Sequence, residues 1–418
     1  MSSSTDGSSF SPAEPVTLTR HRSFVLFWCA RTSTTGALQM LSVAVGWQLY
    51  EMTNNPLDLG ISGLVQFIPL LALTLVVGQV ADRYDRRALI RLTQATKALA
   101  AIALAVGTAG GWLTREWMFV IVFVIGGARA FEMPIMHAIV PDIVPQSILP
   151  RAIAASATAQ QTAIICGPAI GGFFYYRFGP VAVYALCAVT FVTAAVLVSL
   201  VQVTLARLDK RPVTMESLLA GFTYIRDRPL LLGVISLDLF AVMLAGVTAL
   251  LPVYARDILE TDAWGLGLLR SSPAIGALTM SVVLSHRTIA SRTGYYLFAS
   301  VAGYGAAIVV FGLSTSLAFS MVALAAYGAV DAVSVVIRHS LVLTRTPNEM
   351  LGRVMSVNSL FTGASGMLGD FRAGAMAAWL GAVPAVVLGG IGAILVTLAW
   401  MRLFPQLPRI DKIVKDKD

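Results

Sequence analysis

Several ionisable side chains interrupt long apolar stretches of this sequence, where they could bind a charged group or a proton. Arg31 lies in the first apolar stretch, Asp238 in the seventh and Asp331 in the tenth, while Arg129 and Glu132 are three residues apart in the fourth. An ionisable group inside a membrane is costly and usually faces a cavity or a partner. We therefore interpret these five residues as candidates for solute binding or proton transfer.

The three carboxylates are the candidate proton carriers. A carboxyl group in a low-dielectric environment binds a proton more readily than one in water, as a carrier near neutral pH requires. Asp238 and Asp331 have no basic residue one turn away on the same helix, so they are the leading candidates. Glu132 is the next, because it could instead form a structural ion pair with Arg129 on the same helix face. We expect Arg338 near a membrane surface, where a long side chain can reach water.

The predicted cavity combines basic, amide and aromatic side chains. Gln39 lies eight residues after Arg31, on roughly the same helix face. Such a mixed field suits an anionic or zwitterionic organic molecule better than a lipophilic cation. The alternative is that Arg31 only neutralises a carboxylate and leaves an apolar cavity. The cavity candidates are Arg31, Gln39, Gln66, Arg129, Gln161 and Phe240.

Composition defines the elements that must position these residues. Of 418 residues 57% are hydrophobic and only 12% are charged, whereas soluble proteins carry about 25% charged residues. This excludes a soluble enzyme, a disordered chain and a nucleic-acid-binding domain as first interpretations. The three cysteines and four histidines are scattered, which predicts no metal site. We find no nucleophile–base spacing, HExxH or GxxxxGK[ST], so we expect neither an enzyme nor a nucleotide-driven pump. A lipid scramblase or membrane enzyme is the alternative from a different class.

Between residues 24 and 404 we find about twelve apolar stretches, each long enough to cross about 30 Å of hydrocarbon as a helix. The seventh is predicted as one continuous helix, Leu230–Tyr254. With both termini inside, 21 of the 30 Lys and Arg residues fall in cytoplasmic segments, three in the opposite loops and six within helices. Such a bias follows the positive-inside rule and explains the net charge of +8 without a nucleic acid.

The sequence also repeats itself, which predicts two halves. The segment from Gly127 resembles that from Gly328, so that Pro145 aligns with Pro347. Two similar halves are typical of a transporter whose site lies between them. We expect an all-α integral membrane protein with twelve transmembrane helices in two pseudo-symmetric six-helix bundles. The predicted parts are a disordered cytoplasmic tail at 1–22, bundles at 23–205 and 230–405, a cytoplasmic linker at 206–229 with a short amphipathic helix from Thr214 to Arg226, and a cytoplasmic tail at 406–418.

The predicted loop after the second helix carries a motif. Residues 78–87 read GQVADRYDRR, which resembles motif A of the major facilitator superfamily, Gly-x-Leu-Ala-Asp-Arg-x-Gly-Arg-Lys/Arg. Asp85 replaces the second glycine. The resemblance implies a gating role for Gly78, Asp82, Arg83, Arg86 and Arg87. An aspartate there can cap a neighbouring helix, and the arginines can bind carboxylates or helix C-termini.

A second motif lies in the fifth predicted helix. Gly167, Pro168, Gly171 and Gly172 form GPxxGG, which resembles the end of motif C, the antiporter signature of superfamily exporters. Pro168 can kink the helix and the glycines allow another helix to approach closely. The alternative is a packing kink without a role in antiport.

The segments GARAFEMP, IVPQSILPRAIAASA and MLGDFRAGAMAAWLGAVPAVVLGG resemble the enterobactin-exporter-like branch of the superfamily. This resemblance implies proton-coupled export of a siderophore or drug-like molecule by alternating access, in the bacterial inner membrane. It implies no cofactor beyond a proton gradient, and as partners only a small organic substrate and the lipid bilayer. We expect a monomer. The alternative within transport is uptake or facilitated diffusion of an organic solute.

Overall fold

The computed structural model describes residue 18 and residues 21–202, 215–287 and 291–412, which form helices and no β-strand. A helix satisfies its own backbone hydrogen bonds, which lipid requires. The helices are α1 (Arg22–Thr53), α2 (Pro56–Arg83), α3 (Arg86–Ala109), α4 (Arg115–Ala138), α5 (Val140–Ile143), α6 (Leu149–Ser199), α7 (Met215–Arg226), α8 (Pro229–Ala245), η2 (Thr248–Leu250), α9 (Leu251–Val253), η3 (Tyr254–Ile258), α10 (Ala263–His286), α11 (Thr293–Gly312), α12 (Leu317–Arg345), α13 (Asn348–Leu380) and α14 (Ala382–Leu403).

Eight segments of the described chain are long and apolar enough to cross a membrane. This number is below the twelve that the sequence predicts, for two reasons. First, α6 counts once, although Gly179 (φ 79°) and Pro180 divide its 51 residues into two helices. Second, α1, α4 and α13 are not among the eight. These three helices carry Arg31, Arg129 and Asp370, which lower their hydropathy.

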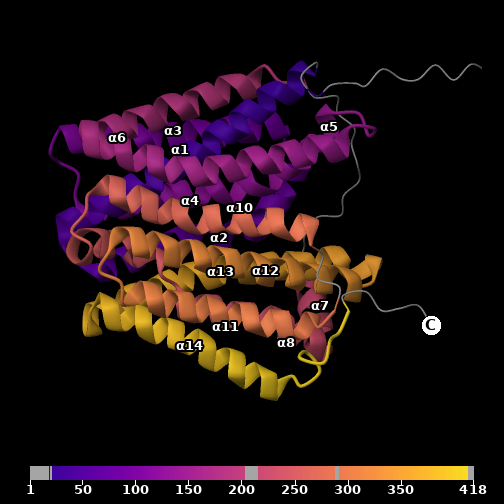
Figure 1. The fold of residues 1–418 in the computed structure, drawn as a ribbon. Helices are drawn as coiled ribbons and strands as arrows, with labels where there is room; N and C mark the ends of the chain where they lie inside the picture. Colours follow the sequence, from indigo (N-terminus) through magenta and orange to yellow (C-terminus); the bar gives the residue numbers. More distant parts are fainter. Residues whose placement is uncertain (1–17, 19–20, 203–214, 288–290, 413–418) are drawn as a thin grey trace, which may run out of the picture.

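The helices pack in two sets (Figure 1). In the first set, α6 packs against α1 and α3, and α4 packs against α2 and α3. In the second set, α12 packs against α10 and α11, while α14 packs against α8 and α11. The two sets meet mainly where α6 crosses α10 and where α2 crosses α13. These crossings place residues that are far apart in the sequence beside one another, such as Gly172 with Ala263 and Gly60 with Gly374.

Glycines allow close approach at these crossings. A Cβ on Gly171 would lie 2.6 Å from the Cα of Met40 in α1, and one on Gly172 would lie 2.3 Å from the carbonyl oxygen of Ala263 in α10. The predicted motif C glycines therefore face α1 within their own set and α10 in the other set. Gly167 also faces α1, where a Cβ would lie 2.7 Å from the Cβ of Gln39.

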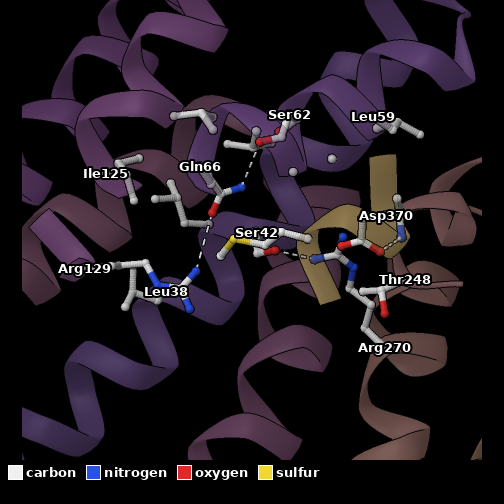
Figure 2. A pocket seen from close by; sticks show the side chains of 17 residues that line it. Leu38, Ser42, Leu59, Ser62, Gln66, Ile125, Arg129, Thr248, Arg270 and Asp370 are labelled. Atoms are coloured by element: carbon white, nitrogen blue, oxygen red, sulfur yellow. Dashed lines mark hydrogen bonds between the residues drawn. The ribbon is translucent and has the colours of Figure 1, made fainter. Parts of the chain in front are cut away.

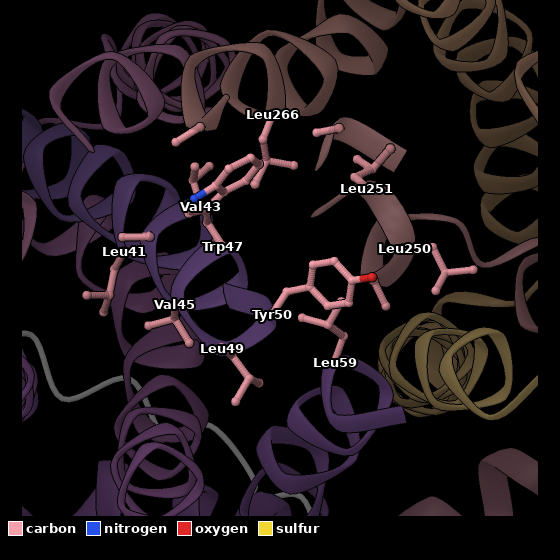
Figure 3. Close-up of a cluster of buried hydrophobic side chains, with 14 of the residues drawn as sticks. Leu41, Val43, Val45, Trp47, Leu49, Tyr50, Leu59, Leu250, Leu251 and Leu266 are labelled. Carbon is pink, nitrogen blue, oxygen red and sulfur yellow. The ribbon is translucent and has the colours of Figure 1, made fainter. Parts of the chain in front are cut away.

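The two sets are also joined at the end where α1 finishes and α10 begins, which we call the Tyr50 end. Tyr50 of α1 hydrogen-bonds to Asp257, and the Nη1 of Arg256 donates to the Tyr50 carbonyl (3.4 Å). Apolar side chains from both sets fill the space beside them, including Trp47, Leu251 and Leu266 (Figure 3). This buried cluster closes the Tyr50 end.

The chain breaks after α8, where the sequence predicts one helix from Leu230 to Tyr254. The helix ends at Gly246, and three short turns follow up to Ile258. A Cβ on Gly246 would lie 2.6 Å from the backbone of Gly369 in α13, so the break occurs where two backbones touch. The Ala249 N–H freed there donates to the Oδ1 of Asp370 (3.2 Å). The prediction of one continuous helix was wrong, because a run of apolar residues gives no sign of the tertiary contact between Gly246 and Gly369.

The predicted connecting segments are described only in part. Residues 1–17, most of the predicted tail, and 203–214 of the linker region lie outside the described residues. The predicted amphipathic helix corresponds to α7. Within the predicted C-terminal tail, Leu407 and Ile410 are buried, and the Thr293 N–H donates to the Asp411 carbonyl (3.0 Å). The described part of this tail therefore packs against the start of α11, while 413–418 lie outside the described residues.

Candidate functional site

A cavity of about 200 Å³, which we call the central cavity, lies between the two helix sets. The first set contributes Ser42, Gln66 and Arg129 to its polar lining, and the second set contributes Arg270 and Asp370 (Figure 2). Because the residues come from α1, α2, α4, α10 and α13, the cavity changes shape whenever one set moves against the other. It lies beside the closed Tyr50 end, on the side of the α2–α13 crossing.

The two arginines of the central cavity are held by uncharged oxygens. The Nη1 of Arg129 donates to the Oε1 of Gln66 (3.4 Å), and Arg270 donates to the hydroxyl of Ser42. In Figure 2 Ser42 appears between the two guanidinium groups. The Nε of Arg270 is buried and has no hydrogen-bond partner among the described atoms. Since an arginine offers five N–H donors, both side chains have donors to spare for a bound acceptor.

A second cavity of about 200 Å³, the side cavity, continues from the central cavity within the first set. Leu38, Ser42 and Arg129 line both cavities. The side cavity adds Arg31, whose Nη2 donates to the Oε1 of Gln160 in α6 (2.7 Å). The structure thus brings together four predicted residues, Arg31, Gln39, Arg129 and Glu132.

The partner of Glu132 differs from the one that the sequence suggests. Its Oε2 lies 2.6 Å from the Nζ of Lys97 in α3, whose side chain is fully buried, and its Oε1 accepts from Gln94 (2.7 Å). Arg129 points instead to Gln66 in α2. The Arg129–Glu132 pair was therefore the wrong pairing, because α4 packs between α2 and α3 and the two side chains reach different neighbours. Lys97 cancels the charge of Glu132.

Asp238 and Asp331 lie apart from both cavities, in a charge cluster with Arg338. Arg338 forms a salt bridge with Asp238, and both side chains are only 11% exposed. The Nη2 of Arg338 is 3.8 Å from the Oδ1 of Asp331, which is 36% exposed. The three residues line a small cavity of about 10 Å³ between α8, α11 and α12. Arg338, which the sequence predicts near a membrane surface, has a buried partner in α8 a hundred residues away.

Two predicted cavity residues lie elsewhere. Phe240 stacks on Trp400 of α14, with ring centroids 5.2 Å apart, and is 37% exposed. Gln161 lines neither the central nor the side cavity, whereas its neighbour Gln160 does. A one-residue step turns a helix by about 100°, so a sequence pattern that admits two adjacent amides cannot choose between them.

The motif A segment is described in part. The side chains of Gly78, Asp82 and Arg83 lie outside the described residues. The Nη1 of Arg86 lies 2.6 Å from the Oδ2 of Asp142 in α5, and the Nη1 of Arg87 donates to the Val201 carbonyl (3.1 Å) just after α6. These are the carboxylate and helix-end contacts that the motif implies for its arginines.

Asp85, which replaces a motif glycine, has its own role. Its Oδ1 accepts from the Arg87 N–H (3.0 Å), so it caps the start of α3. The replacement supplies a helix cap in place of a flexible turn.

Sequence reasoning missed Arg270, Asp370 and Ser42 as lining residues. Arg270 and Asp370 carry the signal that identified the others, a charge within an apolar stretch. What the sequence could not supply is the α2–α13 contact that brings Asp370 into the central cavity. In the described part of the chain, no three His, Cys, Asp or Glu residues are placed to hold a metal ion.

Comparisons with known proteins agree on one family. The model of the family described as "Transmembrane secretion effector" matches residues 10–417. The enterobactin exporter EntS of Citrobacter koseri is 29% identical over 405 residues, covering 94% of each chain. The EntS of Escherichia coli is 30% identical over 395 residues, covering 91% of this chain and 88% of the relative.

Two solved structures share the fold. A bacterial homologue of the human lysosomal transporter Spinster, in an inward-facing and unoccupied conformation, has a TM-score of 0.72 at 13% identity and covers 92% of this chain and 98% of its own. The nucleoside transporter NupG has a TM-score of 0.70 at 11% identity and covers 91% and 99%. At these identities the likeness concerns the fold alone.

Proposed function

We propose that this chain, which belongs to the transmembrane secretion effector family of the major facilitator superfamily, is a proton-coupled exporter of a small anionic or zwitterionic organic molecule. The observation that carries the proposal is the central cavity, which lies between two helix sets and receives an arginine from each, Arg129 and Arg270. A solute bound there contacts both sets, so its binding and release are tied to their relative movement.

The cavity charge supports an acidic substrate group. Arg31, Arg129 and Arg270 line the two cavities, while Lys97 cancels the charge of Glu132. Asp370 alone among the lining residues remains to balance three guanidinium groups. Interactions between charges are stronger away from water. A carboxylate, a phenolate or the acidic end of a zwitterion therefore fits these walls better than a lipophilic cation.

The names of the relatives support export. The two relatives described above are enterobactin exporters, and the GPxxGG segment resembles an exporter motif. We propose a siderophore or drug-like molecule as the substrate class. We propose that the transporter works as a monomer.

We propose twelve transmembrane helices in two six-helix bundles, 23–205 and 230–405. The eight apolar segments are joined by the second part of α6 and by α1, α4 and α13, which pack among them. The distribution of Lys and Arg favours an inner-membrane protein with both termini in the cytoplasm. In that orientation the closed Tyr50 end faces outward, and this state receives substrate from the cytoplasm. Alternating access then requires the Tyr50–Asp257 contact to open.

Flux in reconstituted vesicles tests the function. The purified chain is inserted into liposomes loaded with enterobactin, or with a panel of organic acids and drugs, and a pH gradient of either sign is applied. We expect solute to move against the proton flow, with arginine variants of the central cavity inactive. Movement only with the proton flow would favour uptake, and gradient-independent equilibration would favour facilitated diffusion. Phospholipid flipping without solute flux would favour a scramblase.

A further inference from the structure

We propose that Arg338 is the coupling switch of this transporter: it is shared between Asp238 and Asp331, and the carboxylate that it does not pair with binds the proton. The proposal rests on the proton coupling proposed above and adds a positioning residue and a location. It places the proton site in the second helix set, away from the substrate cavities.

The geometry shows one cation between two anions. Arg338 forms a salt bridge with Asp238 of α8, and its Nη2 lies 3.8 Å from the Oδ1 of Asp331, two turns away on α12. Thr362 of α13 donates to the second oxygen of Asp238 (3.4 Å), which completes the shell of the paired carboxylate. Among the described residues, no hydroxyl group donates to Asp331 in this way, and Asp331 is the more exposed of the two acids.

Charge balance predicts how many protons this cluster binds. With both acids ionised, the three residues carry a net charge of −1, and one proton brings it to zero. A net charge inside a membrane is costly, so the cluster binds one proton and not two. In this state the proton adds to an Asp331 carboxylate oxygen. If Arg338 moves to Asp331, the proton bonds to Asp238 instead, and no other group gains or loses charge.

Among the described residues, the lining of the small cavity offers Arg338 no acid besides Asp238 and Asp331. Tyr304 of α11 lines the same small cavity, and its ring centroid lies 4.8 Å from that of Tyr327 on α12. His339 follows Arg338 on the same helix. Asp370 of α13 lines the central cavity and not this one. Among the described residues that line the small cavity, Asp238 and Asp331 are the two acids and Arg338 is the one base.

Exchange of substrate for protons requires such a remote site. An anion bound beside a carboxylate strengthens proton binding to that carboxylate, so a proton site in the central cavity would be filled together with an anionic substrate. Linkage makes this effect reciprocal. The charge cluster avoids it, because the small cavity shares no lining residue with either of the other cavities and coupling can pass through the movement of the set.

Infrared titration of the purified full chain in lipid nanodiscs, without any substrate, tests the proposal. We expect wild type to show a protonated-carboxyl band that rises as the pH falls. Asp331→Asn and Asp238→Asn should each remove this same band, because either change leaves one acid paired with Arg338. Arg338→Gln should make the band about twofold larger and keep it to higher pH, since both acids then lack a cation, while Arg338→Lys should restore wild-type behaviour. Asp227→Asn, at a carboxylate 63% exposed, is the matched control and should leave the band unchanged.

A fixed structural ion pair gives a different pattern. Asp238→Asn would then leave the band of Asp331 in place, and this result, or an unchanged band in Arg338→Gln, would overturn the proposal. If Arg338→Gln does not fold, the two Asn variants still decide the matter. Because no substrate is present, a chain that titrates as expected but moves no solute would contradict the proposed function and leave the proton site standing.

Discussion

The arginines of the two cavities and the arginine of the charge cluster have different partners. Arg31 and Arg129 donate to the amide oxygens of Gln160 and Gln66, and Arg270 donates to a hydroxyl. Arg338, by contrast, lies between two carboxylates. An arginine whose hydrogen bonds go to neutral oxygens can still pair with an acidic ligand group, even though Asp370 lies in the same cavity as Arg270. An arginine held by carboxylates is already neutralised. The comparison assigns substrate binding to the first group and proton coupling to the second.

Glu132 and Lys97 show how the first helix set keeps the cavity positive. Glu132 lines the side cavity, and its charge would otherwise oppose that of Arg31 and Arg129. Lys97 approaches from α3, behind the cavity wall, and its side chain is fully buried. Because Glu132 forms its salt bridge with Lys97, it is not the salt-bridge partner of Arg31 or Arg129.

Removing that cation should have the largest effect. Lys97→Met leaves Glu132 buried without its partner, which costs about 3–5 kcal/mol for a buried pair. We expect a strongly lowered midpoint of thermal unfolding in detergent. The double variant Lys97→Met with Glu132→Gln should recover most of the loss, because no unpaired charge remains. A single variant as stable as wild type would mean that Glu132 has another counter-charge.

Replacing an arginine of the central cavity should have the second-largest effect. Arg129→Gln or Arg270→Gln should weaken binding of benzoate by roughly 10- to 100-fold, since a charge-assisted hydrogen bond contributes about 1.5–3 kcal/mol. Binding of benzamide, which has the same shape and no charge, should change little. Calorimetry on the purified chain measures both. Equal losses for the two probes would show that the arginines shape the cavity and do not select an anion.

Arg31 tests whether an arginine of the side cavity also contributes to substrate binding. It lines the side cavity and not the central one, so Arg31→Gln should weaken benzoate binding by only about 5-fold, or about 1 kcal/mol. Neutral probes should be spared. A shift of the pH optimum of transport with unchanged selectivity would move Arg31 from the substrate-binding group to the coupling group.

The smallest change is expected at the motif A segment, which lies outside both groups. Asp82→Asn should leave the protein folded in the membrane but slow transport several-fold, because the resemblance implies a gating contact there. The variant should also shift the accessibility of cysteines introduced at the Tyr50 end. Wild-type flux together with wild-type accessibility would remove Asp82 from the gate.

Local sequence patterns predicted the helical elements and several site residues, but not their pairings. The apolar stretches predicted an all-helical membrane protein, and charges within them pointed to Arg31, Arg129 and Glu132, which line the side cavity. Which charges meet depends on helix crossings that no local pattern encodes. Glu132 pairs with Lys97 across 35 positions, and Asp238 with Arg338 across 100.

The break after α8 was missed for the same reason. The helix ends at Gly246, where the backbone of Gly369 in α13 lies beside it, and Asp370 accepts a hydrogen bond from the Ala249 N–H. Within the sequence, Gly246 is one glycine in an apolar run. The residue that marks the break is Asp370, more than a hundred positions away.

Transport by two variants tests the division between substrate binding and proton coupling most directly. Arg129→Gln and Asp331→Asn are reconstituted in liposomes, and enterobactin flux is measured twice, once driven by a pH gradient and once as exchange at equal pH. The account predicts that Arg129→Gln lowers both fluxes in the same proportion, whereas Asp331→Asn abolishes gradient-driven flux and spares exchange. Loss of exchange in Asp331→Asn, or gradient-driven flux at the wild-type rate in either variant, would contradict it.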